Sequence, residues 1–380
     1  MKKILHIVPY YLPQYGGIEQ VANDIVNILK GKYANKIICF SETGKTIVNE
    51  YEGIEVHRIG WIKKISSQAI SFSYFFKLYK LLKEYNPDYI HLHLPNPLIT
   101  VYLLICLVFI NKKIRIIGHW HSDIIEQKVI KKFYNPIQNI LLKRLNKIIV
   151  TSKEYGEKSE DLRNFQKKLA VIPNIVNEKI LDIFNEKEIN KIKNKYKNKK
   201  IIFFIGVHRK YKGLQYLVES SKYLSDGYKI IIAGKGPLTE ELKEMSKSDT
   251  KIEFVGKITD EEKVSYYYAS DVFAFPSITK NEAFGVALAE ALYCELPAVT
   301  FKIEGSGVNW VNKNEYTGIE VKEKAAEEFA KALIKVIENR EYYSKNCKTW
   351  ILENFTQKNI KNNLINLYEN NGDNSEKNYN

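Results

Sequence analysis

The chain has 380 residues, of which 45% are hydrophobic and 27% charged, a composition typical of a globular protein with enough length for two domains. The net charge of +14 is uneven, because residues 1–180 hold 27 Lys and Arg against 15 Asp and Glu, whereas residues 181–380 hold 31 against 29. A basic first half points to an anionic partner, such as a membrane surface, a phosphate-bearing lipid or nucleic acid.

The cysteine spacing argues against a disulfide framework or a zinc ribbon. The four cysteines are far apart and predict buried free thiols in a reducing cytoplasm. The N-terminal apolar run is six residues long and ends at Pro9, which is too short for a signal peptide. The most apolar stretch, residues 98–110, is shorter than the ~20 residues that span a bilayer, and we expect a core helix there.

In chain order, short apolar runs alternate with helical patterns. In the first half, strands are expected at residues 2–10, 35–41, 54–60, 88–93, 114–121 and 146–152, and helices at 17–32, 75–87 and 98–110. In the second half, strands are expected at 199–206, 228–234, 252–256, 271–277 and 296–301, and helices at 213–224, 237–247 and 285–294. This alternation predicts an α/β protein with two doubly wound, Rossmann-like domains.

The predicted domains are residues 1–175 and 176–345. A helical segment at 346–370 follows them, and residues 371–380 have a disordered composition. Ligands of open α/β sheets bind at the carboxyl ends of the strands. Two such domains therefore predict a ligand held in a cleft between them.

Two motifs in the first half follow strands. In YYLPQYGGIEQ, Gly16 and Gly17 lie between a strand and a helix, where backbone N–H groups can approach an anion or simply form a tight turn. In GHWHSD, His119 and His121 share one face of a strand, with Asp123 two residues on. We prefer a histidine that hydrogen-bonds a polar ligand over a structural histidine or a metal site.

The second half carries a basic cluster in FFIGVHRKYKG. Arg209, Lys210 and Lys212 follow a buried strand, a position suited to a diphosphate, although a solvated basic loop is the alternative.

In TKNEAFGVALAEA, Glu282 and Glu290 are eight residues apart. If the segment were helical, their backbones would lie about 12 Å apart, more than a glycosidase pair allows. A helix that begins near Phe284, Gly285 and Val286 would present N–H groups to a phosphate.

These motifs together resemble glycosyltransferase family 4, the retaining enzymes with the GT-B fold, over nearly the whole chain. The most specific stretch is PSITKNEAFGVALAEALYCELPAV. The resemblance implies a final helix that crosses back to the first domain. Departures are Val207 where an arginine is common, PNIVN in place of PNGxD, and Lys235 where an acidic residue is common.

The resemblance also implies the roles of the site residues. Glu282 contacts the donor sugar, Glu290 holds the nucleotide ribose, and Arg209 with Lys212 stabilises the leaving diphosphate. The remaining donor contacts are at Phe284, Gly285 and Val286. His121 lies over the sugar, and Gly16 and Gly17 cradle phosphate. The sequence has no Asp-x-Asp, so we expect a metal-independent reaction without a cofactor.

The expected reaction is transfer of a hexosyl unit from a nucleotide diphosphate sugar to a glycan or lipid-linked acceptor in synthesis of lipopolysaccharide, O-antigen or capsule. GDP-mannose is preferred as donor over a UDP-sugar. The enzyme is expected in the cytoplasm, peripheral on the inner membrane face, where residues 66–85 interleave aromatic residues and lysines. Alternatives are a nucleotide-sugar 2-epimerase of the same fold and a basic nucleic-acid-binding protein; we expect no nucleic-acid partner.

Overall fold

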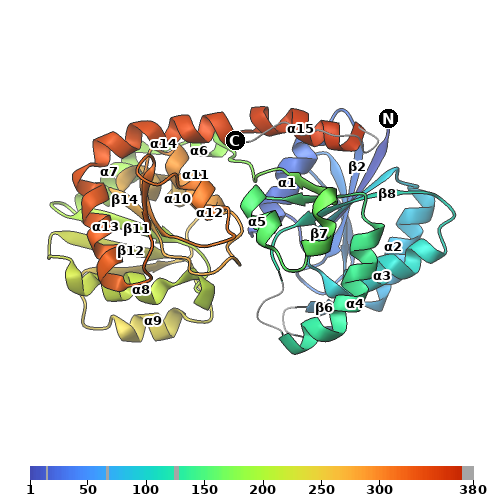
Figure 1. Ribbon diagram of the computed structural model, residues 1–380, viewed down its shortest axis with the longest axis horizontal. Coiled ribbons are helices and arrows are strands. Elements are labelled where there is room, and N and C mark those ends of the chain that lie inside the picture. Colours follow the sequence, from blue (N-terminus) through green and yellow to red (C-terminus); the bar gives the residue numbers. More distant parts are fainter. Residues whose placement is uncertain (14–15, 66–67, 124–127, 370–380) are drawn as a thin grey trace. The chain divides into compact units, whose positions relative to one another are not determined.

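The computed structural model describes residues 1–13, 16–65, 68–123 and 128–369, and it divides the chain into two compact units. Unit 1 comprises Met1–Thr151, Ser159–Ile172 and the chain from Ile360 onward. Unit 2 comprises Ser152–Lys158 and Pro173–Asn359. Both units are α/β with parallel sheets, as the sequence predicted (Figure 1). The tail predicted at 371–380 lies outside the described residues.

Unit 1 has an eight-stranded sheet in the order β10-β9-β8-β7-β1-β2-β4-β3, in which only the edge strand β3 is antiparallel. Its strands are β1 (Lys3–Ile7), β2 (Ala34–Phe40), β3 (Ile47–Tyr51), β4 (Ile54–Ile59), β7 (Tyr89–Leu94), β8 (Arg115–Trp120), β9 (Lys147–Val150) and β10 (Leu169–Val171). A separate hairpin joins β5 (Lys63–Ile65) to β6 (Gln68–Ile70). Its helices are α1 (Gly17–Leu29), α2 (Phe72–Glu84), α3 (Pro97–Val108), α4 (Lys128–Arg144) and most of α15 (Gln357–Glu369).

Unit 2 has a six-stranded parallel sheet in the order β13-β12-β11-β14-β15-β16. Its strands are β11 (Lys200–Ile205), β12 (Tyr228–Ala233), β13 (Ile252–Gly256), β14 (Val272–Phe275), β15 (Ala298–Phe301) and β16 (Gly318–Val321). Its α-helices are α5 (Lys153–Lys158), α6 (Glu178–Leu181), α7 (Glu186–Lys195), α8 (Leu214–Ser220), α9 (Thr239–Met245), α10 (Asp260–Ala269), α11 (Val286–Tyr293), α12 (Val308–Val311), α13 (Ala326–Glu338) and α14 (Arg340–Asn354).

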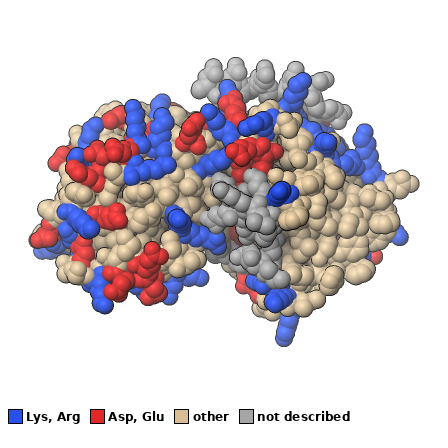
Figure 2. Space-filling model, turned by 60° about the horizontal axis from the view of Figure 1, so that its bottom comes forward, with Lys and Arg blue, Asp and Glu red and all other residues tan. Residues whose placement is uncertain are grey.

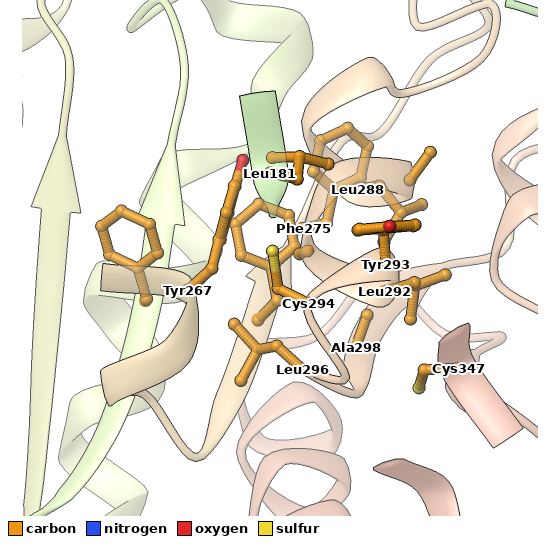
Figure 3. Packing of buried hydrophobic residues seen from close by; sticks show 14 of the residues in the cluster. Leu181, Tyr267, Phe275, Leu288, Leu292, Tyr293, Cys294, Leu296, Ala298 and Cys347 are labelled. Carbon is orange, nitrogen blue, oxygen red and sulfur yellow. The ribbon is translucent and has the colours of Figure 1, made fainter. Parts of the chain in front are cut away.

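Apolar side chains cover both faces of the unit 2 sheet. In β11, Ile201 and Phe203 belong to the cluster on one face, and Ile202 and Phe204 to the cluster on the other. Alternating strand residues point to opposite faces, so a doubly covered strand must be continuously apolar. Figure 3 shows one of these clusters, in which side chains of α10, α11 and β14 pack together.

Two boundaries differ from the sequence prediction. Ser152–Lys158 groups with unit 2, because Glu154 Oε1 accepts a hydrogen bond from Gly305 N at 2.9 Å and Lys158 pairs with Glu304 at 2.9 Å. The helical segment predicted at 346–370 is two helices, α14 and α15.

The chain crosses back to unit 1 within α15, as the sequence predicted. Tyr368 in α15 contacts the unit 1 sheet, because its carbonyl oxygen accepts from Tyr89 Oη at 2.7 Å. The helix is interrupted between α14 and α15, where Thr356 forms an isolated β-bridge with Val176 of unit 2.

The prediction that residues 98–110 form a core helix was half wrong. α3 buries one side, including Ile99, Leu103 and Cys106, but Val108 and Phe109 are 79% and 65% exposed. α3 lies in the outer layer, so the sheet covers only one of its sides. Because the helix is apolar all round, its other side remains apolar and exposed. No helix in the described part of the chain is both long and apolar enough to cross a membrane.

Candidate active site

The loop that leads from β14 into α11 carries the most specific motif of the sequence. Residues 279–285 are non-helical, and α11 begins at Val286 with Gly285 as its N-cap. Gly285 has φ +89°, and a Cβ there would lie 3.2 Å from the ring of Phe275. Only glycine suits this left-handed position, so the motif places the start of α11 where the sequence expected it.

Two neighbouring segments fix the backbone of this loop. Gly307 N donates to Ala283 O at 2.9 Å, and Ser306 Oγ donates to Glu282 O. Phe284 is buried and packs edge-on against Phe355, with ring centroids 5.4 Å apart. The side chain of Phe284 is therefore part of the core, and only its backbone can face a ligand.

Glu282 is paired with Lys212, seventy residues earlier in the chain. Lys212 Nζ donates to Glu282 Oε2, Ser277 Oγ donates to the same oxygen at 3.3 Å, and the Lys212 and Glu282 side chains are each only 12% exposed. Burial lowers the pKa of Lys212, but the charge of Glu282 and the hydrogen bond to it outweigh this effect and raise the pKa overall. Lys212 is therefore a stable cation beside a carboxylate.

The short helical turn η2 (Lys210–Lys212) holds Lys212 in place. The ammonium lies 5.0 Å from the ring centre of Phe275 and 5.4 Å from that of Tyr211. Gly213, which follows, has φ +63° and backs onto the carbonyl of Pro276, where a Cβ would clash at 2.0 Å. Arg209 starts the same turn, but its side chain is exposed. The structure thus brings Lys212 and Glu282 into contact and leaves Arg209 in solvent at the same loop.

Glu290 on α11 lies in a second, partly buried charge cluster, which it forms with Asp260 and Lys263 of α10. Lys263 Nζ is 3.0 Å from Glu290 Oε2 and 3.1 Å from Asp260 Oδ1, and Tyr267 Oη donates to Glu290 Oε2 at 3.1 Å. Burial lowers the pKa of Lys263, but the charges of Glu290 and Asp260 raise it overall. Sequence reasoning missed Lys263 and Tyr267, because no local pattern shows which side chains of α10 face α11.

Two further polar groups near Glu282 were not predicted. Thr279 Oγ1 and Asn281 Oδ1 are buried and have no hydrogen-bond partner within the described part of the chain. Buried polar atoms rarely stay unpaired, because each costs about 1–3 kcal/mol. The quoted motif TKNEAFG already contained both residues, but only the structure shows that their oxygens are buried.

In unit 1, Gly16 is the N-cap of α1 and Gly17 its first residue. Gly16 has an extended backbone, φ −173°, so no positive φ requires glycine. A Cβ on Gly16 would instead meet Glu19 Oε2 at 2.2 Å, because that carboxylate folds back toward the start of the helix. Burial raises the pKa of Glu19. A carboxylate already occupies the end of α1 that favours anions.

His121 belongs to a row of five stacked histidines on one face of the unit 1 sheet. The row consists of His6 on β1, His91 and His93 on β7, His119 on β8 and His121 just after it. Burial lowers the pKa of His121 to about 3 and of His6 to about 4, and it lowers the pKa of the other three well below 6.5. All five rings are neutral at neutral pH.

His93 fixes the ring of His121. His93 Nδ1 and His121 Nε2 are 2.8 Å apart, and one of the two neutral rings must donate to the other. The Nδ1 atom of His121 is then the nitrogen left for a ligand. The sequence placed His93 on a strand, but gave no sign that His93 pairs with His121 across twenty-eight residues.

The sequence predicts no metal site. Among the described residues, however, one group of three histidines could hold a metal ion. His91, His93 and His119 each offer a ligand nitrogen, and these atoms lie within 4.8 Å of one another. Nitrogens that share one tetrahedral zinc at ~2.0–2.1 Å lie roughly 3.3 Å apart, so the rings would have to move. Asp123 is not part of this group, because its carboxylate accepts from Trp120 Nε1 at 3.0 Å and from Ser159 Oγ at 2.6 Å.

Comparison with known proteins identifies the family of the chain. Residues 15–179 match the model of Glycosyltransferase Family 4, and residues 185–351 match that of Glycosyl transferases group 1. The two matches together cover most of the chain, one in each half. The chain therefore belongs to the group 1 and family 4 glycosyltransferases and is a transferase enzyme with the GT-B fold.

Three similar proteins cover most of the chain. It is 27% identical to O-antigen chain mannosyltransferase C of Escherichia coli over 96% of this chain and 98% of that protein. It is 29% identical to D-rhamnosyltransferase WbpZ of Pseudomonas aeruginosa over 84% and 82% of the two chains. Among solved structures, Anabaena Alr3699/HepE in complex with UDP-glucose superposes with a TM-score of 0.78 at 16% identity, over 97% and 100% of the chains.

Proposed function

We propose that the enzyme transfers a hexosyl unit, with retention of anomeric configuration, from a nucleotide diphosphate sugar to a glycan or lipid-linked saccharide. The observation that carries the proposal is the loop and helix at 279–290, which present Glu282 beside a buried cation and Glu290 in a separate charged cluster. Relatives named as a mannosyltransferase and a rhamnosyltransferase support a role in bacterial surface polysaccharide synthesis and support GDP-mannose as donor. The UDP-glucose complex of a structural neighbour supports a UDP-sugar as the second choice.

The proposed chemistry starts with leaving-group stabilisation. As the diphosphate departs, Lys212 and Arg209 would neutralise its charge, with the N–H groups of Gly285 and Val286 at the start of α11 directed to the same anion. Glu282 would then exchange its partner, because the sugar hydroxyls compete for the carboxylate that Lys212 holds. Glu290 would accept hydrogen bonds from the ribose, and His121 would contact the sugar through Nδ1. The proposed step needs no metal, and the sequence has no Asp-x-Asp.

In the cell, we propose that the protein is cytoplasmic and peripheral on the inner face of the membrane, where lipid-linked acceptors are presented. The basic first half supports attraction to an anionic lipid surface.

Lys212→Ala and Glu282→Ala test the site. Each should lower transfer by about 10²–10³, because a charge-stabilising contact is lost in a water-poor site. A thermal-shift screen with GDP, UDP and their sugars should first identify the donor, since a specific ligand raises the melting temperature. Transfer of label to acceptor is then measured with that donor.

Lys210→Ala is the matched control, because Lys210 lies in the same turn and is exposed. The control should retain activity, and circular dichroism should show all variants folded. Normal turnover by either site variant would contradict the proposal. Conversion of the sugar nucleotide without any acceptor would identify a 2-epimerase instead.

A further inference from the structure

The outer surface of unit 1 formed by α2, α3 and α4 is a continuous layer. Cys106 Sγ of α3 lies 3.9 Å from the carbonyl of Phe75 in α2, and the rings of Phe75 and Tyr102 are 6.1 Å apart. On the other side of α3, Thr100 Oγ1 and Tyr134 Oη of α4 are 3.0 Å apart. The three helices therefore lie side by side, and their outward sides form one surface.

Each helix exposes large apolar side chains on that outward side. The spacings are i,i+4 on α2, i,i+3 and i,i+4 at the end of α3, and i,i+7 on α4, so each set lies on one side of its helix. We call these residues the apolar face: Phe72 and Phe76 (67% exposed each), Ile105 (43%), Val108 (79%), Phe109 (65%), Phe133 (77%) and Ile140 (58%). Single exposed apolar residues are ordinary, but a set on three adjacent helices marks a binding surface.

The apolar face has a basic margin. α2, α3 and α4 together carry eight Lys or Arg and one acidic residue, Glu84. Lys80 and Lys83 at the end of α2 and Lys143 at the end of α4 are exposed. Figure 2 shows a broad uncharged area on this unit, with Lys and Arg mainly at its edges.

The combination identifies the occupant. Two copies of the chain that met through this face would bring their basic margins together, and like charges repel. An anionic bilayer suits both the apolar face and its basic margin, since acyl chains cover the apolar residues and lipid headgroups attract the lysines. We propose that unit 1 binds anionic membranes by inserting the apolar face of α2, α3 and α4 between the headgroups.

This inference deepens the proposed function and depends on it for its biological purpose, which is access to a lipid-linked acceptor. The sequence predicted membrane contact through the α2 segment, whereas the proposed membrane-binding surface is centred on α3. α3 has no charged residue within Pro97–Val108 and exposes its C-terminal end. No span across the membrane is needed for binding of this kind.

The test is flotation of the full-length protein with vesicles of phosphatidylcholine alone and of phosphatidylcholine with phosphatidylglycerol in a roughly 2:1 ratio. The wild type should bind the anionic vesicles and lose much of that binding in high salt. The double variant Phe76→Ser, Phe109→Ser should bind about tenfold or more weakly. Lys80→Glu with Lys83→Glu should weaken binding to anionic vesicles only.

The matched control is Ile183→Ser in unit 2, an apolar residue that is 71% exposed and lies outside the apolar face. It should bind vesicles as the wild type does. The inference is overturned if the wild type fails to float, if the double variant and the control bind alike, or if sedimentation shows a dimer that only the double variant breaks. Transfer to a soluble acceptor separates the two proposals, because a protein that binds vesicles but transfers nothing contradicts only the proposed function.

Discussion

The candidate site residues of unit 1 and unit 2 differ in charge state. In unit 2, Lys212 and Lys263 are partly buried cations, each against a carboxylate. In unit 1, the five stacked histidines are neutral and hydrogen-bond mainly to each other or to tyrosine and asparagine. The difference follows from the partners: each lysine keeps its charge beside a carboxylate, whereas a buried imidazole without an opposite charge loses its proton.

The comparison has a functional meaning under the proposed reaction. A leaving diphosphate needs positive charge, which unit 2 supplies in a fixed position. Contacts with an uncharged sugar hydroxyl need hydrogen-bonding groups of fixed orientation, which neutral stacked imidazoles provide. The predictions below test this division, in order of decreasing effect.

The first prediction concerns acid. Histidines with lowered pKa bind fewer protons when folded than when unfolded, where they titrate near 6.5. Stability therefore falls as the pH drops below about 6.5, by about 2 kcal/mol for each such histidine at pH 5. The lysines of unit 2 have raised pKa values, so their contribution is fully present below about 10.5 and is lost only as the pH rises through the folded pKa.

Hydrogen exchange followed by mass spectrometry measures this difference between the units. After correction for the intrinsic pH dependence of exchange, peptides from β7 and β8 should lose protection between about pH 7 and pH 5. Peptides from β14 and β15 should keep it, whereas β11 and β12 are unsuitable controls because the buried His208, whose pKa burial also lowers, packs at their ends. Equal loss of protection in both sheets would contradict the assignment of acid sensitivity to the histidine row.

The second prediction separates the two glutamates of α11 and its loop. Glu290→Gln removes the negative charge beside Lys263 and weakens the proposed ribose contact, so KM for the donor should rise about 10-fold to 100-fold with a smaller change in kcat. Glu282→Gln should instead lower kcat. Steady-state kinetics with the identified donor measures both. A Glu290→Gln variant that loses kcat at unchanged KM would place Glu290 at the reacting centre.

The third and smallest effect concerns His93 as a positioning residue. His93→Leu removes the hydrogen bond that orients His121, and transfer should fall about tenfold. His93→Asn places an amide near the position of Nδ1 and should restore part of the activity. Nitrogen-15 correlation spectra should show one tautomer of His121 in the wild type and a mixture in the leucine variant. Unchanged spectra in the leucine variant would mean that His93 does not orient His121.

The two parallel sheets could be predicted from sequence because their strands are encoded by local patterns of apolar residues. Continuous apolar runs such as β11 must be buried on both faces, and Gly285 marks a left-handed backbone position at the start of a helix. The same locality explains why Glu282, Gly285 and Glu290 could be recognised from one short motif.

Only the tertiary structure decided the partners of those residues. Lys212 meets Glu282 across seventy residues, and Lys263 meets Glu290 from a separate helix. Side-chain pairing of this kind depends on how elements pack, and no spacing along the chain encodes it. The orientation of α3 was likewise decided by the tertiary structure. Because its sequence is apolar on every side, the sequence does not indicate which side the sheet covers and which side faces outward.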